Sequence, residues 1–266
     1  MEAGHLKKVW RYREFILSSV KREYQSKYQG SLLGSAWTVL NPMAMIFVYA
    51  MVFSKIMQAR LPDSSSTFSY SIYLCAGMLT WGLFAEIVGR GQTIYLENAN
   101  IIKKLKFPIG SLPVIMLLNA TLNFTIIFSI FIGFLLISGN FPGWIVLAFF
   151  PVLFVQLVFV MGLGLTLGVL NVFFRDIGQL FAIVLQFWFW LTPIVYPAEI
   201  LPESIAPFLL EFNPMAAIIQ SYQTIFVHSA SPNWSALLMP LFLGLLLCLL
   251  AKKLFSKYGD EIVDEL

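Results

Sequence analysis

The chain has 266 residues, of which 59% are hydrophobic and only 12% are charged. A soluble domain cannot hide that much apolar surface, and no polar block is large enough to form a separate core, so soluble fold classes are excluded. The formal net charge is only +3, and its distribution along the chain is more informative than its sum.

Residues 1–35 are basic and lack the apolar core of a secretory signal, so we expect them to remain in the mature protein as a cytoplasmic interface segment. Several apolar residues of this segment share one helical face, with basic residues around the rest: Leu6, Trp10, Leu17, Val20 and Tyr24. This pattern is typical of an amphipathic helix in the headgroup layer of a membrane. A plain positive anchor that fixes topology is the alternative.

The apolar runs predict an all-α integral membrane fold, because a hydrocarbon core about 30 Å thick needs about 20 apolar residues of helix. We expect one membrane domain over residues 36–255 and a cytoplasmic tail over residues 256–266. Its six transmembrane helices are predicted at residues 36–57, 71–89, 109–137, 144–174, 177–196 and 236–255. The polar pair Arg175 and Asp176 predicts a tight hairpin turn between the fourth and fifth helices.

The basic residues predict the orientation of these spans. With the N-terminus inside, only Lys55 and Arg60 of the seventeen Lys and Arg residues fall toward the outer side. Cytoplasmic loops carry an excess of Lys and Arg, so both termini are expected in the cytoplasm. Residues 197–232 are mostly apolar but are broken by five prolines, which predicts short re-entrant periplasmic helices between spans 5 and 6.

Several kinds of chemistry have no support in the sequence. There is no Gly-rich phosphate loop of the Walker type, so we expect ATP to be bound elsewhere. His5 and His228 fall on opposite sides, and Cys75 and Cys248 match no metal or redox spacing. The carboxylates are scattered, which argues against an enzyme. We therefore expect no catalytic residue, cofactor or metal on this chain, and no nucleic-acid partner.

Two features within the spans favour packing roles. Glu86 and Arg90 lie four residues apart near the inner end of the second span, where they can pair along one helix face. Gly164 and Gly168 have the spacing that lets another helix approach closely. A direct substrate role for Glu86 and Arg90 is the alternative.

Four stretches of sequence occur in an order that resembles a known family. They are residues 27–34 running into Trp37 and Asn41-Pro42, residues 100–104 with Phe107-Pro108, residues 171–177, and residues 193–197 with Phe212-Asn213-Pro214. On this topology they resemble the permease subunit of ABC-2 type polysaccharide exporters, also called type V exporters. That group carries O-antigen, capsule and teichoic acid chains.

The resemblance implies a non-catalytic subunit of an ABC transporter in the bacterial inner membrane. Two copies of this chain would form a channel, and two copies of a separate ATPase subunit would bind ATP and Mg and drive export. The implied cargo is a glycan on undecaprenyl diphosphate or a similar lipid. In the family, the N-terminal helix and the segment before the third span contact the ATPase. The candidate coupling residues are Arg22, Tyr24, Glu97, Asn100, Lys103, Lys104, Arg175 and Asp176.

Aromatic side chains are the candidates for lining a glycan channel, because sugar CH faces stack on rings without being held tightly. The candidates are Trp37, Tyr49, Phe53, Phe187, Trp188, Trp190 and Tyr196. Interfacial belts and lipid-facing Phe are the alternative explanation for such residues. Two other functions stay open: an ABC-2 permease for a drug or small lipid, and a passive membrane channel or scaffold. A copurifying ATPase would separate the passive channel from the other two.

Overall fold

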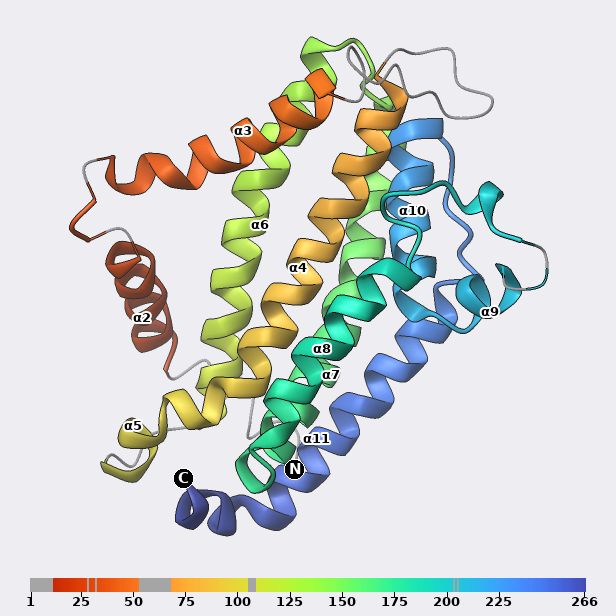
Figure 1. Ribbon diagram of the computed structural model, residues 1–266. Helices are drawn as coiled ribbons and strands as arrows, with labels where there is room; N and C mark the ends of the chain where they lie inside the picture. The colour runs from red at the N-terminus through yellow and green to blue at the C-terminus, as the bar shows by residue number, and fades with distance from the viewer. Residues whose placement is uncertain are drawn as a thin grey trace.

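The computed structural model describes residues 12–27, 29–31, 33–52, 68–104, 109–202, 204 and 206–266. Every regular element among these residues is a helix. Four long helices form the body of the molecule: α4 (Ser69–Glu97), α6 (Ser111–Ile137), α7 (Phe149–Phe173) and α11 (Leu238–Glu265) (Figure 1). The 3-10 turn η3 (Gly143–Ala148) leads directly into α7.

Among the described residues, four helical stretches are long and apolar enough to cross a membrane: Ser69–Glu97, Ser111–Ile137, Gly143–Phe173 and Leu238–Gly259. They coincide with the second, third, fourth and sixth predicted spans, which makes the chain a multi-pass, all-helical membrane protein. The 29 residues of α4 extend well beyond the predicted end at residue 89. At 1.5 Å per residue α4 is about 43 Å long, so its last turns reach past a 30 Å hydrocarbon core.

The helices at the first and fifth predicted spans are shorter. Helix α3 (Trp37–Met51) has 15 residues and follows the 3-10 turn η1 (Gly34–Ala36), and α8 (Asp176–Leu191) has 16. Residues 53–57 of the first predicted span lie outside the described part of the chain. By the rule of about 20 residues, neither described helix is a full span by itself, so the total of six stays a prediction.

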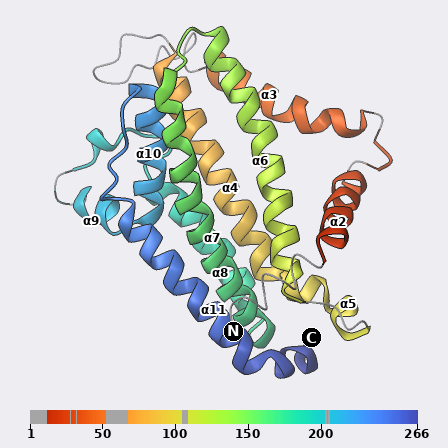
Figure 2. The ribbon, with the colours of Figure 1, turned by 180° about the vertical axis from the view of Figure 1, so that it is seen from behind.

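Glycines set the spacing between the central helices. A Cβ on Gly91 of α4 would lie 2.8 Å from the Cα of Gly164 on α7, and a Cβ on Gly168 would collide with the Gly91 carbonyl oxygen. On the other side of α7, a Cβ on Gly162 would lie 2.6 Å from the carbonyl oxygen of Gly244 on α11. The predicted packing role of the α7 glycines is therefore confirmed, and α7 lies between α4 and α11 with backbone against backbone (Figure 2).

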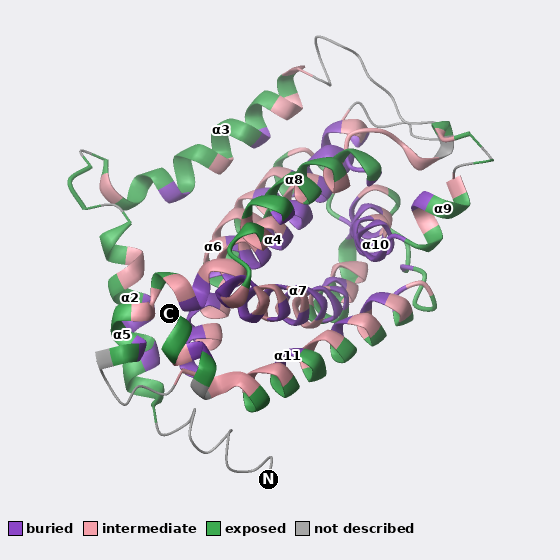
Figure 3. Cartoon of the chain, turned by 60° about the horizontal axis from the view of Figure 1, so that its bottom comes forward, coloured by how far each residue is buried: buried purple, intermediate pink, exposed green. Residues whose placement is uncertain are grey.

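The described residues of the proline-rich segment, 197–232, contain three short helices: η4 (Ala198–Ile200), α9 (Ala206–Glu211) and α10 (Pro214–His228). Helix α10 is largely buried against α4 and α7, whereas α3 and the outer face of α11 are exposed (Figure 3). The short helices were expected, but the sequence did not predict that the longest of them would lie inside the bundle.

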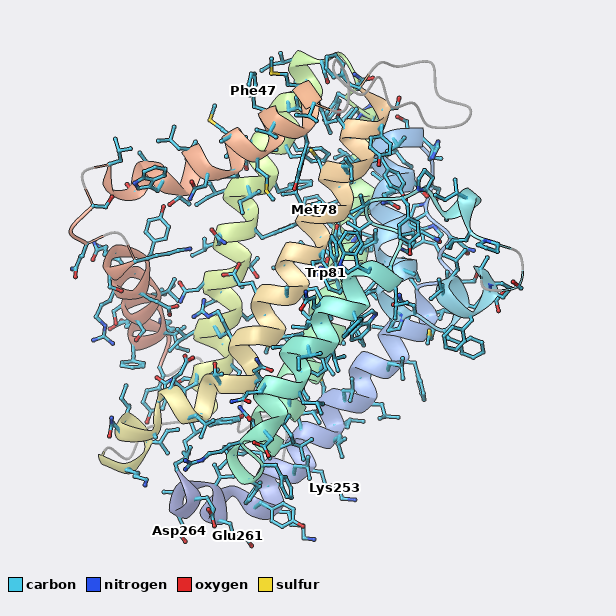
Figure 4. The ribbon with its side chains drawn as sticks, in the orientation of Figure 1. Phe47, Met78, Trp81, Lys253, Glu261 and Asp264 are labelled. Carbon is cyan, nitrogen blue, oxygen red and sulfur yellow. The ribbon has the colours of Figure 1, made fainter. Side chains whose placement is uncertain are left out.

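The charged elements that do not span the membrane lie at one end of the molecule. Helix α5 (Ala99–Lys104), the turn between α7 and α8, and the last turns of α11 all lie there (Figure 1). Lys253, Glu261 and Asp264 project from this end (Figure 4). Helix α11 bends at Tyr258, and beyond the bend Ile262 is fully buried in the same apolar cluster as Ile102 of α5. The segment expected as a cytoplasmic tail is thus helical and packed under the bundle.

Candidate functional site

Helix α2 (Arg13–Ser26) packs along α6 beside the bundle. Ile16 and Val20 are four residues apart, so they share one face of α2, and they form a small apolar cluster with Ile115 of α6. The sequence predicted an apolar face that includes both Val20 and Leu17. Leu17 is 62% exposed, so the face that packs on protein is rotated toward Ile16.

A polar network ties α2 to the bundle one turn beyond these residues. Glu23 pairs with Arg90 of α4 and accepts a hydrogen bond of 2.5 Å from Asn119 Nδ2 of α6. Arg90 also lies 3.9 Å from Glu86, and Asn123 Nδ2 donates to Glu86 Oε2 at 3.0 Å. The predicted Glu86–Arg90 pairing is confirmed. The sequence analysis missed Glu23, although it is an isolated acid in a basic stretch.

Three cavities follow this network from the charged end toward the middle of the spans. The first, of about 630 Å³, lies among α2, α4, α5 and α6. The second, of about 360 Å³, shares Glu23, Ser26 and Arg90 with the first. The third, of about 400 Å³, shares Glu86 and Asn123 with the second and is otherwise mostly apolar. Met78 and Trp81 of α4 line the third cavity (Figure 4). The α2–α3 side therefore carries a discontinuous groove that changes from polar to apolar.

The structure brings some of the predicted coupling residues together. Arg22 of α2 and Glu97 at the end of α4 both line the first cavity. Tyr24 donates a hydrogen bond of 3.3 Å to Thr38 at the start of α3. Asn100 and Lys103 are exposed on α5, where Lys104 ends the helix. Helix α5 lies at the charged end, and α2 lies beside the bundle. Nothing in the structure tests a contact with an ATPase, so the role of these residues stays a prediction.

Arg175 and Asp176 form the tight turn predicted between the fourth and fifth spans. Asn171 holds this turn: its Nδ2 donates to the Gln92 carbonyl oxygen at 2.8 Å, and its Oδ1 accepts from Gly178 N at 3.0 Å. One amide side chain therefore joins α7, α4 and the first turn of α8. This explains the asparagine in the 171–177 stretch without assigning it to coupling.

The predicted channel aromatics fall into different environments. Trp37, Phe187 and Trp190 are 40%, 66% and 61% exposed on α3 and α8. Trp188 points inward, where its Nε1 donates to Asn213 Oδ1 at 2.8 Å and its ring meets Phe84 edge-on at 5.2 Å. Tyr49 is half-buried, and Phe53 lies outside the described residues. The geometry favours packing for Trp188 and leaves the exposed rings as channel candidates.

A hydrogen-bonded junction connects the two proline motifs. Asn213 caps α10 by accepting from Met215 N and Ala216 N, and its Nδ2 donates to Thr192 Oγ1 at 2.9 Å. Tyr73 of α4 donates to the carbonyl oxygens of Pro193 and Tyr196 at 3.0 and 2.8 Å. Tyr196 in turn donates to the Trp190 carbonyl oxygen at 2.9 Å. The 193–197 and 212–214 stretches thus fix the exit of α8 and the entry of α10.

Comparison with known proteins identifies the family of this arrangement. The family model described as ABC-2 type transporter matches residues 14–227, from α2 to the end of α10. The chain belongs to the ABC-2 type transporter family. Over 262 residues this ABC-2 transporter is 29% identical to the O-antigen export system permease protein RfbA of Myxococcus xanthus, covering 98% of both chains.

Two further relatives of this ABC-2 transporter have related names. The O-antigen export system permease protein RfbA of Klebsiella pneumoniae is 25% identical over 92% of each chain. The polysialic acid transport protein KpsM of Escherichia coli is 24% identical over 85% of this chain and 89% of its own length. All three relatives are named for the export or transport of a polysaccharide.

Proposed function

We propose that this ABC-2 transporter is the permease subunit of an ATP-driven exporter that moves lipid-linked polysaccharide, such as O-antigen, across the bacterial inner membrane. The similarity to RfbA of Myxococcus xanthus carries this proposal, because it covers 98% of both chains. The similarity to KpsM, whose cargo is also a polysaccharide, supports the same class of cargo.

The proposed membrane topology has six spans, with α3 and α8 in the first and fifth. It places both termini and the charged end of the bundle in the cytoplasm, because cytoplasmic loops are rich in Lys and Arg. Helices η4 and α9 would then be the re-entrant elements on the periplasmic side. The proposed transporter contains two copies of the chain. Large exposed apolar residues on α8 support a second copy or lipid there: Leu180, Ile183, Phe187 and Trp190.

The proposed energy source is a pair of separate ATPase subunits that bind ATP and Mg. The absence of a Walker loop from the sequence supports the placement of ATP binding on a separate subunit. Helices α2 and α5 are the proposed contact elements, together with the end of α4 and the hairpin turn. The proposed contact residues are Arg22 and Tyr24 on α2, Glu97 at the end of α4, Asn100, Lys103 and Lys104 on α5, and Arg175 and Asp176 at the hairpin turn. Charge reversal at Lys103 and Lys104 should reduce both ATPase copurification and export.

The proposed glycan path uses the exposed aromatics, because a polymer has to slide through without tight binding at any one unit. Phe187 and Trp190 lie on the exposed face of α8, and Trp37 lies at the start of α3. The double variant Phe187→Ala/Trp190→Ala should lower export while the protein remains in the membrane. Phe154→Ala is the matched control, since Phe154 is a similarly exposed aromatic on α7 that was not predicted to line the channel.

Deletion of the gene in its host tests the function itself. Lipid-linked glycan should accumulate inside the cell while surface glycan disappears, and the wild-type gene should restore the surface glycan. If glycan is unchanged on both sides of the membrane, the proposal is wrong and the chain is a permease for a drug or small lipid. Survival of export without any ATPase would instead indicate a passive channel.

A further inference from the structure

The cavity of about 630 Å³ under α2 lies at the ends of two candidate spans. The last turns of α4 and the first turns of α6 form two of its walls, and α2 and α5 close the others. The ends of spanning helices mark the level at which hydrocarbon gives way to lipid headgroups. Its apolar lining residues are Phe15, Ile94, Ile101, Leu112, Ile115 and Met116.

The charged residues that line this cavity, two Arg and two Glu, have a formal net charge of zero. Glu23 and Arg90 neutralise each other in the α2–α4 pair. Within the described part of the chain, Arg22 and Glu97 make no ion pair, although both line the cavity. Among the described residues, the cavity therefore has one guanidinium and one carboxylate without an ion-pair partner, and both residues are exposed.

Ser19 adds a second sign that the site is incomplete without a ligand. It lines the same cavity, is 8% exposed, and its hydroxyl oxygen is buried with no hydrogen-bond partner among the described residues. Buried polar groups are nearly always satisfied by protein, water or a ligand. A ligand with a hydrogen-bonding group beside α2 would satisfy Ser19 after a change of its rotamer.

We propose that this cavity binds the headgroup of a phospholipid that carries a primary amine, of the phosphatidylethanolamine class. The Arg22 guanidinium would hold the phosphate through paired hydrogen bonds, and the Glu97 carboxylate would accept from the ammonium. An anionic headgroup would lack a partner for Glu97, and a choline headgroup has no N–H to donate to it. The acyl chains would follow the apolar lining, and the volume lies within the range of about 300–1,000 Å³ for ligand sites.

This lipid site goes beyond the proposed function and does not depend on which cargo is exported. A lipid bound between α2, α4 and α5 would support the position of α2 against the bundle. For Arg22 and Glu97 the lipid site replaces the proposed contact with the ATPase, which leaves the other proposed contact residues unchanged. Glycan export and lipid retention are separate measurements, so polysaccharide export and the lipid site can each fail alone.

The test uses the full chain, reconstituted in vesicles of phosphatidylethanolamine, phosphatidylcholine and phosphatidylglycerol in equal parts and then extracted with mild detergent. Native mass spectrometry measures the lipids that remain bound. The wild type should retain phosphatidylethanolamine over phosphatidylcholine by roughly tenfold, the effect of one charge-assisted hydrogen bond. Glu97→Gln should remove that preference, and Arg22→Gln should lower retention of both lipids. Glu14→Gln and Lys21→Gln on α2 are the matched controls, because neither residue lines the cavity.

Equal retention of the three lipids by the wild type, or a preference for phosphatidylglycerol, would overturn the proposal. So would an unchanged preference in Glu97→Gln, or displacement of the lipid by the copurified ATPase, which would make the cavity a protein-docking site. Ile101→Trp fills the cavity from α5 without changing its charge and should reduce retention. If a Gln variant aggregates on size exclusion, retention by Ile101→Trp decides the question.

Discussion

The substitution Gly91→Ala tests whether the α4–α7 crossing depends on backbone contact. The added methyl carbon would lie 2.8 Å from Gly164 Cα, 2.9 Å from its carbonyl carbon and 3.1 Å from its carbonyl oxygen. These are backbone atoms of α7, so the methyl group cannot be accommodated by turning a side chain. The two helices must separate, which disturbs the contacts of α7 with both α4 and α11.

The size of the effect follows from comparison with Gly89, two residues earlier on the same helix. A Cβ on Gly89 would meet nothing within 4 Å. Alanine in place of glycine favours a helix by up to about 1 kcal/mol, and both variants share this gain. Overpacking costs about 1–3 kcal/mol, so Gly91→Ala should be less stable than Gly89→Ala by that amount.

Thermal unfolding of the purified protein in detergent, followed by the loss of the monodisperse peak on size exclusion, measures the difference. For a protein of this size the midpoint of Gly91→Ala should lie roughly 2–12 °C below that of Gly89→Ala. Gly89→Ala should match the wild type or exceed it slightly. Equal midpoints for the two variants would refute the inference that α4 and α7 pack through their backbones.

Four further substitutions test the hydrogen-bond networks. Asn213→Ala removes the α10 cap and the hydrogen-bond partner of Trp188. It should lower the free energy of unfolding by about 2–4 kcal/mol, measured as a lower unfolding midpoint. Glu23→Gln and Arg90→Gln, combined in a double-mutant cycle, should show a coupling of about 1 kcal/mol or less, because both groups are partly exposed. Tyr222→Phe leaves the fully buried Gln156 without its donor and should cost about 1–3 kcal/mol, measured as a lower unfolding midpoint.

Each of these predictions has a result that contradicts it. An unfolding midpoint of Asn213→Ala equal to that of the wild type would show that neither the cap nor the hydrogen bond from Trp188 stabilises this junction. A coupling well above about 1 kcal/mol between Glu23→Gln and Arg90→Gln would contradict the expectation for a partly exposed pair. For Tyr222→Phe, the control is Tyr258→Phe near the end of α11, and equal midpoints would indicate that water satisfies Gln156.

Much of the fold could be predicted from local sequence properties. The four long spans are visible because each carries enough consecutive apolar residues to cross the hydrocarbon core. The hairpin at Arg175 and Asp176 is visible because a polar pair interrupts one apolar run. The Glu86–Arg90 pair is visible because residues four apart on a helix are neighbours.

The candidate site could be predicted only in part from the sequence. The sequence singled out Arg22 and Glu97 as coupling candidates but did not show that they line the same cavity. It did not find Glu23 as the partner of Arg90, since 67 residues separate them. It grouped Trp188 with its neighbours Phe187 and Trp190, although neighbouring positions on a helix point in different directions.

The sequence by itself determined the class of protein, the main spans and the amphipathic character of α2, because composition, run length and helical period are properties of contiguous residues. Only the tertiary structure decided that α10 lies inside the bundle, that Gly91 meets Gly164, and that Asn213 joins α8 to α10. These features depend on contacts between residues far apart in the chain. No period or local pattern encodes such contacts, because helices of similar apolarity can pack in many arrangements, and the choice among them is made by close fit and by the pairing of buried polar groups.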